Sequence, residues 1–142
     1  MIIAAERNIL LVPVDFTDVS DFAIDHAVEI ARIFHHKICL LHVSAKRSRG
    51  TDKDIMLLEE LESKAHAMAR RTGLDVQFRI EEGNIPAVIR QEADRLNAEF
   101  VVMGIHGKKG SQQIAGNHAY KVACSSPVPV MVVKHMHHHS GY

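Results

Sequence analysis

The sequence predicts an α/β fold, an open doubly wound five-stranded parallel sheet with helices on both faces. Short apolar runs alternate with longer stretches of helical period along the whole chain. The runs are rich in Ile, Leu and Val, which is typical of parallel strands buried on both faces. Strands that alternate with helices pack as a parallel sheet covered on both sides. The expected strands span residues 8–14, 38–43, 76–80, 100–103 and 128–133.

Four stretches between these runs place apolar residues along one stripe of a helix. The second expected helix carries a Thr51–Asp54 capping pair and a terminating Gly73. The fourth has the weakest apolar pattern. The four helices are expected at residues 20–35, 52–72, 85–96 and 113–124. Apolar positions expected to face the core include Phe34 in the first helix and Ile55, Leu58 and Leu61 in the second.

A chain of 142 residues is long enough for one domain with its own hydrophobic core. We assign this domain to residues 1–134 and expect the histidine-rich residues 135–142 to form a disordered tail, with a metal site in the tail as the minor alternative. Cys39 and Cys124 have no CxxC spacing, and both are expected to be core thiols.

The charge balance limits the classes of partner. The 17 basic and 17 acidic residues give a net charge of zero, which argues against a general nucleic-acid binder. No apolar run approaches the roughly 18 residues that a membrane span needs, and the first residues do not resemble a signal peptide. We therefore expect a cytoplasmic protein with neither nucleic-acid nor membrane partners.

The acidic residue after the first strand is the first candidate for ligand binding. Ligands of open α/β sheets bind beyond the carboxyl ends of the strands. Asp15 directly follows the first strand, where its carboxylate can accept a hydrogen bond from an amine or a ribose hydroxyl. The alternative is that Asp15 only caps the loop before the first helix.

A glycine-rich stretch after the fourth strand is the second candidate. Four glycines, at 104, 107, 110 and 116, let backbone N–H groups approach a ligand closely. A loop of this kind that leads into a helix favours an anion, and Lys108 and Lys109 add positive charge. The spacing matches neither the Walker loop nor the dinucleotide fingerprint. A surface loop without a ligand is the alternative.

Several segments together resemble the universal stress protein family, and the resemblance runs from Ile9 to Val133. It is carried by ILLVPVDFTDVSDFAIDHAVEIA at 9–31, LLHV at 40–43, EEGNIPAVI at 81–89, FVVMGIHGKKG at 100–110 and SSPVPVMVVK at 125–134. The resemblance implies the strand order 3-2-1-4-5, which puts Asp15 and Gly104 on either side of one crevice.

ATP-binding members of this family carry the motif G-x2-G-x9-G-[ST]. This chain departs from it twice, because eight residues separate Gly107 from Gly116 and because position 117 is Asn. Both departures affect the terminal phosphate contact more than the adenosine contacts. The resemblance implies that Pro13, Asp15 and Val43 lie near adenine and ribose. It implies a ribose–phosphate track lined by Met103, Gly104, Gly107, Gly116 and Asn117.

The expected function is adenine-nucleotide binding in stress response, with ATP, ADP or AMP as the ligand and Mg²⁺ as a companion of the phosphates. The resemblance also implies a homodimer, which we expect to form through the apolar edge strand from Val130 to Val133. We assign no catalytic and no metal-ligating residue. Two alternatives are a nucleotide-independent dimeric interaction module and a slow ATPase. An adenylyl-transfer enzyme is disfavoured because no glycine follows the first strand between Asp15 and Ser20.

Overall fold

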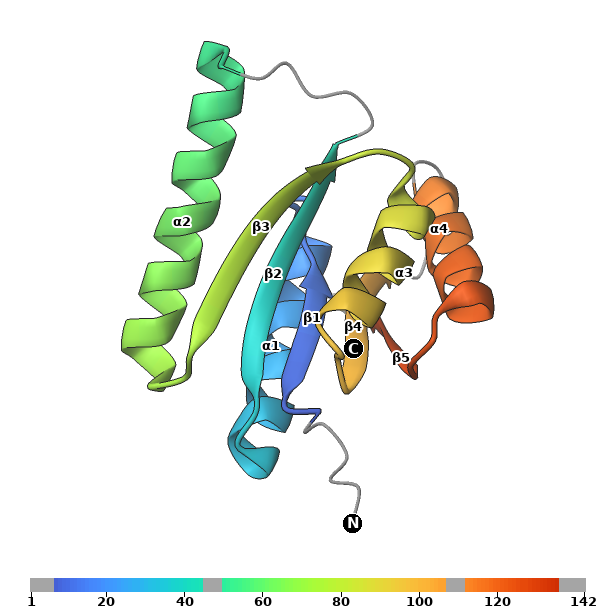
Figure 1. The fold of residues 1–142 in the computed structure, drawn as a ribbon, viewed down its shortest axis with the longest axis horizontal. Coiled ribbons are helices and arrows are strands. Elements are labelled where there is room, and N and C mark those ends of the chain that lie inside the picture. Colours follow the sequence, from blue (N-terminus) through green and yellow to red (C-terminus); the bar gives the residue numbers. More distant parts are fainter. Residues whose placement is uncertain (1–6, 45–49, 107–111, 136–142) are drawn as a thin grey trace, which may run out of the picture.

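The computed structural model describes residues 7–44, 50–106 and 112–135. Strands and helices alternate along these residues, as the apolar pattern predicted (Figure 1). The strands are β1 (Ile9–Pro13), β2 (Lys37–Ser44), β3 (Val76–Glu82), β4 (Phe100–His106) and β5 (Val130–His135). The helices are α1 (Asp18–Phe34), α2 (Asp52–Thr72), α3 (Ile85–Arg95) and α4 (Gln112–Ser125).

The five strands form one parallel sheet in the order β3-β2-β1-β4-β5, so the predicted fold class and strand order are confirmed. The central strand β1 pairs with β2 along its whole length. Its register with β4 covers only Leu10 opposite Phe100 and Leu11 opposite Val101. β1 and β4 are not paired beyond these two positions. Their carboxyl ends flank the point where the strand order reverses.

Two apolar layers hold the sheet between its helices. Alternate residues of a strand point to opposite faces, so Leu10 and Leu11 of β1 enter different clusters. The Leu10 cluster packs under α1 and α2, and the Leu11 cluster packs under α3 and α4. Figure 1 shows α1 behind the sheet and α3 in front of it.

The helix ends follow the capping chemistry that the sequence indicated. The Thr51 side chain accepts a hydrogen bond from the Asp54 N–H at 3.2 Å, which begins α2. Gly73 ends α2 in a left-handed conformation with φ 75°, and its N–H donates to the Ala69 carbonyl at 2.9 Å. At the start of α3, the Asn84 side chain accepts from the Ala87 N–H at 3.1 Å.

Several apolar residues lie outside the core, against expectation. Ile55 and Leu58 of α2 are 46% and 41% exposed, and Phe34 at the end of α1 is 58% exposed. The first turns of α2 extend past the ends of β2 and β3, so no strand lies beneath them (Figure 1). The burial of α2 is confined to Leu61, Ala65 and Met68, which lie farther along the helix.

Two boundaries at the end of the chain also differ. The last strand begins at Val130 rather than at residue 128, because Val128 and Ser126 form a local turn in which Ser126 Oγ donates to the Val128 carbonyl at 2.7 Å. β5 also includes His135, the first residue of the predicted tail. The rest of that predicted tail lies outside the described residues. Among the described helices, none is both long and apolar enough to cross a bilayer.

We expect Leu61→Ala to lower the free energy of unfolding by about 2–4 kcal/mol, because the Leu61 side chain of α2 is fully buried in the core. Leu58→Ala is the matched control in the same helix and should cost no more than about 0.5 kcal/mol. Urea unfolding of both variants measures the difference. Equal losses would mean that the first half of α2 is packed against another surface in solution.

Candidate ligand-binding site

An open pocket lies at the carboxyl ends of β1, β2 and β4, where the strand order reverses. Its empty volume is about 570 Å³, including the space that is open to solvent. An open pocket at this point of an α/β sheet is the usual place for a small organic ligand. Its lining consists of Pro13, Val14, Asp15, Ser20, Leu41, His42, Val43, Ile85, Ile89, Met103, Gly104 and His118.

The structure brings five of the eight predicted site residues together in this pocket. They are Pro13, Asp15, Val43, Met103 and Gly104. Gly107 lies outside the described residues, as do Lys108 and Lys109. Gly116 and Asn117 belong to α4, directly before the lining residue His118. The roles of Gly107, Gly116 and Asn117 stay predictions.

One wall of the pocket is an apolar surface built from three elements. Leu41 and Val43 come from β2, Ile85 and Ile89 come from α3, and Met103 comes from β4. All five belong to the apolar layer under α3 and α4. A flat aromatic ring would remove this apolar surface from water without displacing a charged group.

The carboxylate of Asp15 is held by its own loop. The Asp15 Oδ1 atom accepts hydrogen bonds from the Thr17 N–H at 3.1 Å and from Thr17 Oγ1 at 2.5 Å. Ser20 Oγ also donates to Oδ1 and accepts from the Asp15 N–H at 2.8 Å. Asp15 therefore does cap the loop before α1, which was the alternative to a role in ligand binding. Among the described residues, however, these hydrogen bonds use only Oδ1, and Asp15 also lines the pocket.

These hydrogen bonds keep Asp15 charged. Partial burial of the carboxyl group raises its pKa, but donors on Ser20 and Thr17 outweigh this effect and leave the pKa of Asp15 below its usual value. The ionised group also lies at the amino end of α1, where the helix dipole favours a negative charge. The pocket thus contains a fixed acceptor at neutral pH.

Gly104 has a packing role that its sequence context did not reveal. A Cβ atom at this position would lie 2.5 Å from the Val19 carbonyl oxygen and 2.7 Å from Val19 Cγ1. The first turn of α1 therefore approaches β4 closely on the side opposite to the α3 layer. Glycine is required here for contact with α1, in addition to any contact with a ligand.

Three polar lining residues were missed by sequence reasoning, namely Ser20, His42 and His118. His118 lies four residues before the buried Val122 on α4, a spacing that puts both on the face toward the sheet. That spacing could have identified His118 as a pocket residue from the sequence. No comparable pattern marks Ser20 or His42, because Ser20 lies inside a helix and His42 inside an apolar strand.

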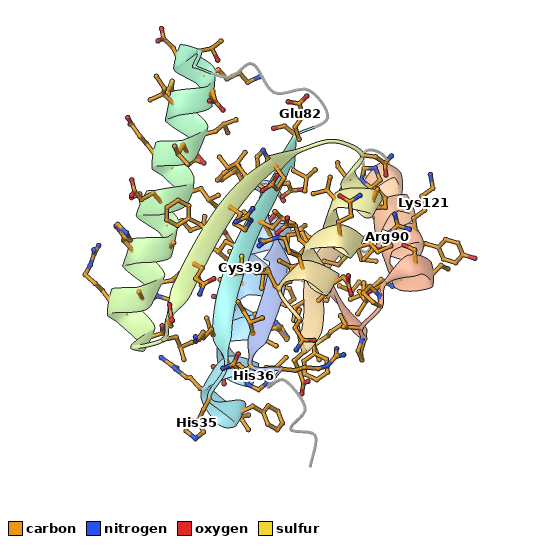
Figure 2. The ribbon with its side chains drawn as sticks, viewed as in Figure 1. His35, His36, Cys39, Glu82, Arg90 and Lys121 are labelled. Atoms are coloured by element: carbon orange, nitrogen blue, oxygen red, sulfur yellow. The ribbon has the colours of Figure 1, made fainter. Side chains whose placement is uncertain are left out.

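The other titratable groups singled out in the sequence lie elsewhere. Figure 2 shows His35 and His36 at the end of the sheet opposite to Glu82, which ends β3. Cys39 is fully buried in the sheet, and burial raises the pKa of its thiol to about 11. Cys124 is exposed, contrary to expectation. No group of three or more His, Cys, Asp or Glu residues in the described ranges could hold a metal ion.

An open parallel sheet with an apolar pocket and an acid at its reversal point is the doubly wound α/β architecture, in which ligands bind at this point of the sheet. The model of the universal stress protein family matches residues 6–134. The chain therefore belongs to the universal stress protein family.

Individual relatives agree with this assignment. A universal stress protein of Methanocaldococcus jannaschii is 29% identical over 137 residues, which cover 88% of this chain and 81% of that protein. The solved universal stress protein from Archaeoglobus fulgidus is similar with a TM-score of 0.76 and 25% identity, over 92% of this chain and 100% of that chain. A structure from the same organism in complex with dAMP has a TM-score of 0.72 and 24% identity, over 91% of this chain and 98% of that chain.

The lowered pKa of Asp15 predicts a pH dependence of stability. Its contribution is fully present above the usual carboxyl pKa of 3.8 and is lost as the pH falls through the lower, folded-state value. The difference in unfolding free energy between wild type and Asp15→Asn should therefore be constant near neutral pH and shrink below pH 3.8. Urea unfolding from pH 7 to pH 2.5 measures it. Asp25→Asn, at an exposed position of α1, is the control for the removal of one surface carboxylate.

Proposed function

We propose that this protein binds an adenine nucleotide in the pocket at the ends of β1 and β4, and that it acts in stress response by binding and dimerisation. One observation carries the proposal: an apolar wall and an ionised acceptor, Asp15, lie in the same open pocket. This pair matches a nucleoside, which has a flat base and adjacent ribose hydroxyls. The dAMP complex of the family member from Archaeoglobus fulgidus supports the choice of ligand class.

In this proposal the base lies against Val43, Ile89 and Met103, and a ribose hydroxyl donates to Asp15. The phosphates would then extend toward α4, along Gly104, Gly107, Gly116 and Asn117. Asp15 is the carboxylate in the described pocket lining, and Oδ1 of this residue is already occupied. Mg²⁺ would therefore be held by the phosphates and solvent, where it would neutralise phosphate charge.

Blocking the apolar wall tests this proposal. Val43→Trp should abolish binding of adenosine, AMP and ATP, because the indole would occupy the space of the base. Calorimetry on protein cleared of bound nucleotide is the measurement. Gln77→Trp puts the same side chain at an exposed position of the edge strand β3 and should bind as wild type does.

The outcomes of this titration separate the alternatives. Binding of adenosine and AMP without ATP would keep the pocket and place the restriction at Asn117 and the shortened glycine loop. Unchanged binding by Val43→Trp would refute the site. If wild type binds none of the three ligands, the interaction module becomes the better description. ATP binding would justify a test for slow hydrolysis.

The homodimer is the second part of the proposal. β5 is an edge strand of the sheet, and its Met131 and Val132 side chains are 39% and 41% exposed. An apolar edge of this kind favours pairing with a second copy.

Val132→Arg should convert the proposed dimer to a monomer of 15.9 kDa, because it would bury two like charges at the interface. Sedimentation velocity gives the mass. Ile33→Arg removes an apolar side chain that is 69% exposed on α1 and should leave the dimer intact. A wild-type protein that sediments as a monomer would rule out this part of the proposal.

A further inference from the structure

The loop between β1 and α1 places Asp15 in the pocket, and the backbone of this loop has an unfavourable conformation at one residue. Phe16, the next residue, has φ 63°, in the left-handed region that bulky side chains rarely adopt. A backbone of this kind persists only where neighbouring groups fix it. On the α1 side, Thr17 and Ser20 fix the Asp15 carboxylate.

On the other side of the loop the fixing group is His42 of β2. Its Nδ1 atom lies 2.8 Å from the Val14 carbonyl oxygen. A carbonyl only accepts, so Nδ1 carries the hydrogen and donates it. The His42 ring also packs against the Phe16 ring, with centroids 4.9 Å apart and planes tilted by 50°.

The two contacts of His42 fall on either side of Asp15. One holds the residue before it, and the other holds the residue after it. The backbone at Val14 is further tied to β2 by its own N–H, which donates to the Leu41 carbonyl at 2.8 Å. Once Val14 and Phe16 are fixed, little freedom is left for the direction of the Asp15 side chain.

We infer that His42 is a positioning residue of the ligand pocket, which orients the Asp15 carboxylate toward the ligand through Val14 and Phe16. This inference rests on the proposed nucleoside site for its effect on binding. Its effect on the carboxylate itself is independent of any ligand, so the two can be tested separately.

Two variants separate the contacts of His42. His42→Phe keeps a ring against Phe16 and removes the donor to Val14, whereas His42→Asn keeps an N–H donor and removes the ring. His42→Phe should weaken adenosine binding about tenfold, because a misdirected Asp15 carboxylate would lose its hydrogen bond to the ribose. His42→Asn should recover most of the affinity. His66→Phe is the matched control at an exposed position of α2, and it should bind as wild type does.

A double-mutant cycle distinguishes positioning from a general loss of structure. If His42 acts through Asp15, His42→Phe should weaken adenosine binding in wild type and have no further effect in Asp15→Asn. Additive losses in the double variant would overturn the inference. Thermal unfolding of each variant shows whether it is folded at the assay temperature.

A ligand-free readout completes the test. Carboxyl NMR titration should show the pKa of Asp15 rising toward its usual value in His42→Phe and staying low in His42→Asn. An unchanged Asp15 pKa in His42→Phe would refute the positioning role, whatever the ligand results. If wild type binds no adenosine but the pKa of Asp15 responds as described, the nucleoside site fails and the positioning role stands.

Discussion

The central strand β1 is apolar on both faces, and this constraint determines where polar groups that could bind a ligand can lie. Leu10, Leu11 and Val12 are completely buried between the two helical layers, so no polar group is tolerated among them. The first polar position is Asp15, where the chain leaves the sheet. Because β1 and β4 lose their register before this point, the acid emerges at an open pocket rather than against a neighbouring strand.

The Asp15 loop shows that capping and ligand binding need not be alternatives. The same carboxylate closes the turn before α1 through Oδ1 and faces the pocket that the adjacent apolar wall completes. A group fixed by its own loop binds a ligand at a lower cost in conformational entropy than a mobile one. The polar contacts of Ser20, Thr17 and His42 thus preorganise one acceptor.

The sequence predicted the fold well because its signals are local. Each buried strand is a short apolar run, and the caps at Thr51 and Gly73 depend on neighbouring residues only. The predicted pocket residues came from strand ends and from the family resemblance. His42 could not be found in this way, since its partners Val14 and Phe16 are distant in sequence. The exposure of Ile55 and Leu58 depends on where β2 and β3 end, which helical periodicity does not encode.

The close approach of Val19 to Gly104 bears on how related sequences should be compared. Selection for packing of α1 against β4 would retain this glycine even in a chain that had lost its ligand. Its presence therefore says little about whether a given family member binds a nucleotide. The informative positions are those whose side chains line the pocket but belong to neither apolar layer, and Pro13 is an example in this chain.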